Sequence, residues 1–117
     1  MNVFNERKQT ANIINQLVGY FQQLEINSFT LDLAQTGTCT RITISGDSND
    51  ICVNLDSIRQ RLTAPRDKTM DAYYGDLLSI YTETSDLALV GLMVDRADVS
   101  CEDGCFRMVL ERDCAEQ

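Results

Sequence analysis

The sequence predicts an α+β fold, built as a single domain over residues 1–117: an N-terminal helix, a three-stranded antiparallel meander, one or two further helices and a C-terminal β-hairpin. Apolar residues near the N-terminus recur at steps of three and four, and two later regions alternate apolar and polar residues between turn sequences. The only proline is Pro65, and no stretch rich in Gly, Ser or Pro marks a linker. Hydrophobic residues make up 44% of the chain, enough for one core, and we expect helices to cover one face of the sheet.

The N-terminal helix is expected from about Asn5 to Glu25. Its apolar residues form one stripe: Ala11, Ile14, Leu17, Val18, Phe21 and Leu24. Polar and charged residues fill the other face, so the stripe predicts packing against the core. The spacing is also nearly heptad, and a dimer seam along part of the stripe is the alternative.

The three strands of the meander are expected at residues 29–34, 39–45 and 51–55, where apolar residues alternate with polar ones. A four-residue loop from Gln35 to Thr38 would pair Ala34 with Cys39. The predicted pairs are then Leu31 with Ile42, Phe29 with Ile44 and, on the outer face, Asp32 with Arg41. A six-residue loop over 45–50 would place Ile51 beside Ile44. All the apolar strand residues would then share one buried face.

The second half of the chain is expected to begin with a short helix, capped by Asp56 or Ser57, with Ile58 and Leu62 facing inward, and ended by Pro65. A second helix is predicted over residues 69–82. Residues 86–99 start with an apolar run typical of a buried strand, and residues 105–112 alternate cleanly. The turn between these strands, 102–104, completes the hairpin. The sequence does not decide whether the two groups of strands form one sheet or two.

The formal charge is −8, from ten basic and eighteen acidic side chains. This balance disfavours direct nucleic-acid binding, which needs cations to neutralise phosphates, and it favours basic partners. Residues 57–70 hold four cations against one acid, and this cluster is a candidate contact for an anion or a partner protein: Arg59, Arg61, Arg66 and Lys68. From residue 71 onward eleven acids accompany three arginines, an excess that could imitate nucleic-acid phosphates. A solvated surface is the alternative for both regions.

Five cysteines and no histidine restrict the metal and redox chemistry of the chain. None of the cysteines forms a C-x-x-C motif, so we predict no metal site. Because the N-terminus lacks the pattern of an export signal, the protein is expected in the cytoplasm with its thiols mainly reduced. A three-residue loop would set Cys101 beside Cys105 as a candidate redox pair. A four-residue loop, which the patterning favours, would separate them.

We predict no catalytic residues, no cofactor and no membrane partner. The sequence has no histidine, no nucleophile elbow, no phosphate-binding glycine loop and no apolar run of membrane-spanning length. This favours a small cytosolic protein-binding module, an adaptor, chaperone-like protein or inhibitor that acts by contact on a protein partner. The expected element order and the acidity loosely resemble those of the small acidic dimeric chaperones of bacterial secretion systems. No motif carries the resemblance, and the closing helix of that class is not expected here.

Two alternatives stay open. A small-molecule or catalytic site could lie near Tyr73, Tyr74 and Tyr81, with an arginine of the Arg59–Lys68 cluster converging on it. An inhibitor that imitates nucleic acid would instead use the acidic second half of the chain. We also expect a homodimer, because the edges of a small sheet must be covered or paired. The cleanly alternating last strand, 105–112, is the predicted contact between the two copies.

Overall fold

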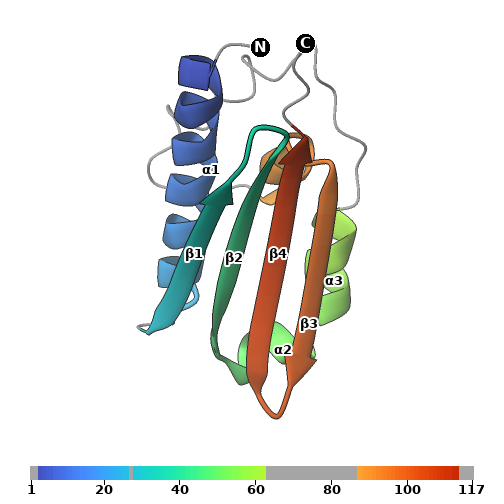
Figure 1. Ribbon diagram of the computed structural model, residues 1–117. Helices are drawn as coiled ribbons and strands as arrows, with labels where there is room; N and C mark the ends of the chain where they lie inside the picture. The colour runs from blue at the N-terminus through green and yellow to red at the C-terminus, as the bar shows by residue number, and fades with distance from the viewer. Residues whose placement is uncertain (1–2, 27, 63–86, 114–117) are drawn as a thin grey trace.

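The computed structural model describes residues 3–26, 28–62 and 87–113. Its elements are α1 (Val3–Gln23), β1 (Phe29–Gln35), β2 (Cys39–Asp47), α2 (Asn49–Val53), α3 (Leu55–Arg61), α5 (Leu87–Gly91), β3 (Arg96–Glu102) and β4 (Cys105–Asp113). The strands form one four-stranded antiparallel sheet in the order β1-β2-β4-β3, and the helices lie behind one face of it (Figure 1). The α+β class is therefore confirmed, and the two groups of strands belong to one sheet.

Helix α1 packs against the core mainly through the predicted stripe, but Ala11 of that stripe is exposed and Ile13, which was not assigned to it, is fully buried. The buried residues are Ile13, Leu17 and Phe21, with Ile14 and Leu24 packed partly buried beside them. The helix ends in two backbone hydrogen bonds, from Ile26 N–H to Phe21 O and from Glu25 N–H to Gln22 O, both 3.0 Å long. This is a Schellman ending, and Glu25 takes the left-handed conformation (φ 62°) that glycine usually supplies there. The ending buries Ile26 and turns the chain toward β1.

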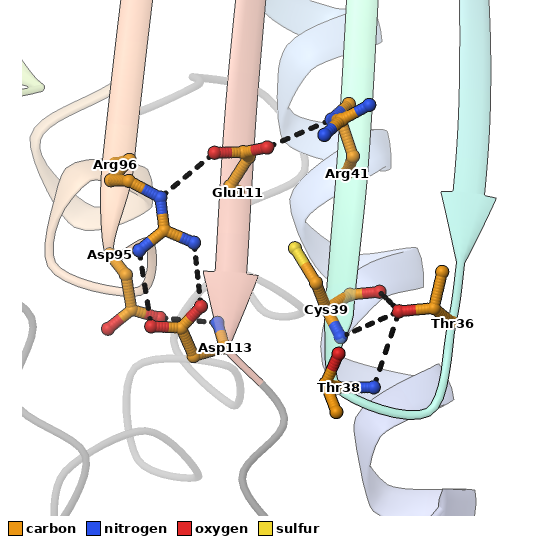
Figure 2. A network of polar contacts seen from close by, with 8 residues as sticks. All are labelled: Thr36, Thr38, Cys39, Arg41, Asp95, Arg96, Glu111 and Asp113. Carbon is orange, nitrogen blue, oxygen red and sulfur yellow. Dashed lines mark hydrogen bonds and ion pairs between the residues drawn. The ribbon is translucent and has the colours of Figure 1, made fainter.

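The hairpin of β1 and β2 shows the predicted faces in a different register. Leu31 lies opposite Ile44 and Asp32 opposite Thr43, so the pairing is shifted by two residues and the predicted pair of Asp32 with Arg41 is wrong. The cause is a tighter turn. The Thr36 N–H donates to Cys39 O (2.9 Å), and the Thr36 hydroxyl accepts the N–H groups of Thr38 and Cys39 (3.3 and 3.0 Å; Figure 2). A shift of two leaves every side chain on its predicted face.

The predicted third strand of the meander is wrong, because residues 49–61 form the short helices α2 and α3. The apolar residues of this region are spaced by four, three and four: Ile51, Leu55, Ile58 and Leu62. That spacing describes one face of a helix. The Ser48 hydroxyl caps α2 by accepting the Ile51 N–H (3.2 Å), whereas Val53, predicted to face inward, is 82% exposed. The predicted inward positions of Ile58 and Leu62 are confirmed.

The predicted strand over residues 86–99 is wrong in its first half. Residues 87–91 form α5, and β3 begins only at Arg96. Helix α5 packs closely on the end of α3, since a Cβ at Gly91 would lie 2.6 Å from Arg61 O and 3.0 Å from Leu62 Cα. A continuous apolar run does not distinguish a buried strand from a buried helix. The helix predicted over residues 69–82 lies outside the described residues.

The hairpin of β3 and β4 is confirmed, with a turn of two residues, Asp103 (φ 55°) and Gly104 (φ 78°). Positive φ at both central residues suits the twist of the flanking strands. The favoured four-residue loop would place Val99 opposite Phe106, whereas the tighter turn places it opposite Met108, two residues along β4 and on the same face. Strand β4 is an inner strand, paired with β2 on one side and β3 on the other. The prediction that the last strand pairs with its copy is therefore wrong, because both of its sides are occupied.

The core is aromatic at one end of the sheet. Phe21 stacks on Phe106 with ring centroids 5.1 Å apart and lies 5.5 Å from the ring of Phe29. Gly46 makes room for these rings, because a Cβ there would lie 3.1 Å from the Cβ of Phe29.

The opposite end of the core is polar. Arg112 of β4 is 1% exposed and donates to both carboxylate oxygens of Glu6, at 2.9 and 2.8 Å. The guanidinium also donates to Met93 O (2.8 Å), and the hydroxyl of Thr40 donates to Glu6 (3.1 Å). This buried network joins α1 to β2, to β4 and to the chain that enters β3.

Candidate functional site

The two edge strands, β1 and β3, are where the backbone of this sheet can bond to another chain. In an antiparallel pair, the N–H and C=O of alternate residues point toward the neighbouring strand, and those of the residues between point away. The bond from Thr36 N–H to Cys39 O continues the pairing of β1 with β2 and fixes the alternation. The backbone groups of four β1 residues therefore point away from the sheet: Phe29, Leu31, Leu33 and Gln35.

The β3 edge is covered by α3. Arg59 donates from Nε and Nη2 to the carbonyl oxygen of Val99, at 3.1 and 2.7 Å, which shows that this carbonyl points away from β4. A disulfide between Cys52 and Cys101, with Cα atoms 5.6 Å apart, ties the end of α2 to the same edge. A second strand cannot approach Val99 without displacing the Arg59 guanidinium.

The β1 edge is free in the described part of the chain. None of its four outward-facing backbone positions has a hydrogen-bond partner among the described residues outside β2 and the adjoining turn. Leu33 is 43% exposed, and Leu31 and Phe29 beside it are only partly buried. These three side chains lie on the helix side of the sheet, and Thr30, Asp32 and Ala34 lie exposed on the other side. An open row of backbone donors and acceptors thus borders a partly apolar margin.

The structure describes two residues of the predicted cationic cluster, Arg59 and Arg61. Arg59 donates hydrogen bonds to the β3 edge, and its Nη1 lies 3.6 Å from Asp56 Oδ1 in an exposed ion pair. Arg61 is exposed and borders a small hollow of about 160 Å³ between the end of α1 and the helices α2 and α3. Arg66 and Lys68 lie outside the described residues, as do Tyr73, Tyr74 and Tyr81 of the predicted small-molecule site.

The small hollow holds a different tyrosine from those predicted. Tyr20 of α1 lines it together with Arg61, Asn54 and Ser57. Burial raises the pKa of the Tyr20 hydroxyl, and the positive charge of Arg61 partly offsets that rise. The phenol therefore stays protonated near neutral pH and acts there as a hydrogen-bonding group.

The predicted pair of Cys101 and Cys105 is not formed in the structure. The two-residue turn places Glu102 opposite Cys105, so Cys101 and Cys105 lie on opposite faces of the sheet. Cys101 pairs instead with Cys52, in a chain whose thiols were expected to be mainly reduced. The sequence signal for this pair was weak, since 49 residues separate the two cysteines.

Cys105 is an exposed thiol beside a polar groove of about 760 Å³, which opens where α1 ends and β1 begins. The thiol donates to Asp47 Oδ1 at 2.9 Å. This hydrogen bond, followed by burial, raises the pKa of the Cys105 thiol. A raised pKa lowers the fraction of thiolate, the reactive form, so the geometry does not favour Cys105 as a nucleophile.

The outer face of the sheet carries a network of ion pairs at one end (Figure 2). Glu111 accepts from Arg41 and from Arg96, both at 2.9 Å, and Arg96 also donates to Asp113 at 2.6 and 3.2 Å. The Asp113 N–H donates in turn to the Asp95 carboxylate (2.6 Å). Acids and arginines therefore alternate across the strands at this end of the sheet.

Glutamine in place of Glu111 is expected to weaken folding by about 1 kcal/mol or less at pH 7, the usual scale of an exposed ion pair. The hydrogen bond from Arg96, and then the one from Arg41, lower the pKa of the Glu111 carboxyl. A group with a lowered folded pKa contributes stability above its unfolded pKa, about 4.3, and loses it as the pH falls through the folded value. Urea unfolding of wild type and E111Q at a series of pH values from 7 downward should show the difference in stability shrinking once the pH falls below about 4.

The matched control for this experiment is E102Q. Glu102 is exposed on β3 and has no ion pair among the described residues, so its replacement should change stability little at any of these pH values. A difference between wild type and E111Q that does not decrease as the pH is lowered below about 4 would contradict the role given to the carboxylate charge.

The described residues contain no group of three or more Cys, Asp or Glu side chains placed to hold a metal ion. No helix among them is long and apolar enough to span a membrane. Comparisons of this chain with protein-family models, with curated proteins and with solved structures found no match.

Proposed function

We propose that this protein is a binding module that acts by contact, and that its β1 edge accepts an extended segment of another protein as an additional strand. The observation that carries the proposal is the contrast between the two edges. The β3 edge is held by Arg59 and the Cys52–Cys101 disulfide, whereas the β1 edge keeps its outward backbone groups free among the described residues. Strand addition of this kind takes its affinity from main-chain hydrogen bonds.

The partly exposed side chains of β1 support the same proposal. Leu33 and Leu31 would be covered by alternate side chains of the added strand, because directly opposite residues in a sheet share a face. Burying apolar surface contributes about 25 cal/mol per Å², so even a short added strand would gain from this margin as well as from the backbone.

The proposal predicts that proline at position 33 abolishes strand addition without unfolding the sheet. Leu33→Pro removes an outward-facing N–H, while the hydrogen bonds of β1 to β2 are made by the residues on either side. A library of seven-residue peptides, the length of β1, should yield binders to the wild type whose affinity for L33P falls at least tenfold. Amide hydrogen exchange should show new protection at Leu31 and Leu33 when such a peptide binds.

The matched control is Ala97→Pro, which removes an outward-facing N–H from the covered β3 edge. This variant should bind the selected peptides as the wild type does. Peptides that bind L33P as well as wild type, or a library that yields no binder to the wild type, would overturn the proposal. Far-ultraviolet circular dichroism of each variant establishes that loss of binding is not loss of folding.

A further inference from the structure

The centre of the free edge carries one charge. Asp32 is exposed on the outer face of β1, and its neighbour across the sheet is Thr43. Across the sheet, Thr43 lies beside Val109, and Val109 lies beside Asp98 on the other edge strand. This row of four residues therefore has an aspartate at each end. No hydrogen bond or ion pair joins Asp32 to another of the described side chains, whereas the neighbouring row holds the network of Arg41, Glu111 and Arg96.

The register makes Asp32 the position of this edge that discriminates most strongly between residues of an added strand. Its own N–H and C=O point toward β2, so an antiparallel strand added at β1 would meet Asp32 in a non-hydrogen-bonded pair. Residues in such pairs approach most closely, with Cα atoms about 4.5 Å apart. A cation opposite Asp32 would therefore favour pairing, and an acid would oppose it.

A second copy of this chain fits the edge poorly. Antiparallel pairing of β1 with its own copy over its full length would set Asp32 directly opposite Asp32. Other registers that avoid this contact shorten the overlap. The charge at the middle of the strand thus acts against self-association, in the way that charged residues protect other sheet edges.

We infer that the occupant of the β1 edge is an extended segment of a different protein that carries lysine or arginine opposite Asp32 and apolar residues opposite Leu31 and Leu33. The inference rests on the function proposed above and names the class of its partner. The apolar positions follow from the partly exposed side chains on the helix side. The cation follows from the Asp32 carboxylate on the outer side, which has no partner among the described side chains. The net charge of −8 adds a long-range attraction for a basic segment.

The test uses two labelled peptides that read the same in both directions: Val-Thr-Val-Lys-Val-Thr-Val and its variant with glutamate in place of lysine. Fluorescence anisotropy should show the lysine peptide binding the wild type about fivefold more tightly than the glutamate peptide. Asp32→Lys should reverse this order, and Asp32→Asn should remove the preference. Asp98→Lys, on the same row at the covered edge, should leave the preference unchanged.

Each other outcome overturns the inference. Equal binding of the two peptides, or binding of neither, excludes the assigned cation, and the peptide library then decides separately whether the β1 edge binds strands at all. A change of preference in D98K would place the contact elsewhere on the protein. A dimer in sedimentation that L33P disperses would show that the occupant is a second copy of this chain.

Discussion

Replacing Glu6 with alanine is expected to lower the free energy of unfolding by about 3–5 kcal/mol. Glu6 and Arg112 form a two-pronged ion pair in which the side chains are 7% and 2% exposed, so neither charge is solvated. Without Glu6, the buried Arg112 guanidinium loses both hydrogen bonds to this carboxylate and the negative charge that they carry. Domains of this size are stable by about 5–15 kcal/mol, so the loss is a large part of the total.

Urea unfolding followed by circular dichroism measures this loss for E6A and for E6Q, which keeps the shape of the side chain and serves if E6A does not fold. Glu111→Ala is the matched control, because it removes a carboxylate that pairs with two exposed arginines, and it should cost about 1 kcal/mol or less. Equal losses for E6A and E111A would contradict the weight given to burial.

Removing both charges distinguishes two contributions to the free energy of unfolding: the cost of leaving Arg112 buried without Glu6, and the net stabilisation by the ion pair itself. Methionine at both positions 6 and 112 should restore most of the stability that E6A loses, because a buried pair often does no better than apolar side chains of similar size. The recovery should be incomplete, since the Thr40 hydroxyl and Met93 O each lose a partner. A double variant as unstable as E6A would show that the ion pair and its hydrogen bonds stabilise the fold more than apolar side chains of similar size can.

The sequence contained part of this arrangement. The alternation of Phe106, Met108 and Leu110 places Arg112 on the inner face of the last strand, and the alternation of Ile42 and Ile44 does the same for Thr40. Both assignments depend only on the period of a strand, which a register shift of two does not change. Their acidic partner, Glu6, was not predictable. It lies at the start of α1, and the position of this helix along the sheet is determined by tertiary packing.

The misassigned segments were those in which two periods compete. Ile51, Val53 and Leu55 alternate as a strand would, but Ile51, Leu55 and Ile58 repeat as a helix would, and the helix formed. Ser48 three residues before Ile51 was the local signal for a capped helix. Placing a strand there also hid the disulfide, since Cys52 was then assigned to the wrong element.

The free edge was not predictable from local pattern. Both terminal strands of the expected meander and hairpin alternate well, and nothing local says that β4 inserts between β2 and β3. That insertion leaves β1 and β3 as edges and brings Arg59 to Val99, a contact between residues 40 positions apart. Asp32 was predicted to pair with Arg41, and the shift of two residues is what leaves its carboxylate facing an open edge.

Reduction of the Cys52–Cys101 disulfide is expected to lower the free energy of unfolding by about 2–4 kcal/mol. The bond closes a chain segment of 49 residues, for which loop-closure entropy alone corresponds to about 4 kcal/mol. It also fixes α2 to the edge of β3, next to the contact of Arg59 with Val99. Urea unfolding with and without dithiothreitol measures the effect, in a variant whose other cysteines, Cys39, Cys105 and Cys114, are serine.

The control is the further replacement of Cys52 and Cys101 by alanine. The free energy of unfolding of this variant should equal that of the reduced protein and should not change with dithiothreitol. Hydrogen exchange locates the effect, because opening of the disulfide should raise exchange in α2 and at the β3 edge before it does so in β1 and β2. Loss of the bond leaves Arg59 on Val99 O, so the β3 edge should stay closed to added strands and peptide binding at β1 should persist. An effect of dithiothreitol on the stability of the alanine variant would show that something other than this bond is responsible. Peptide binding at β3 after reduction would show that the disulfide, and not Arg59, closes that edge.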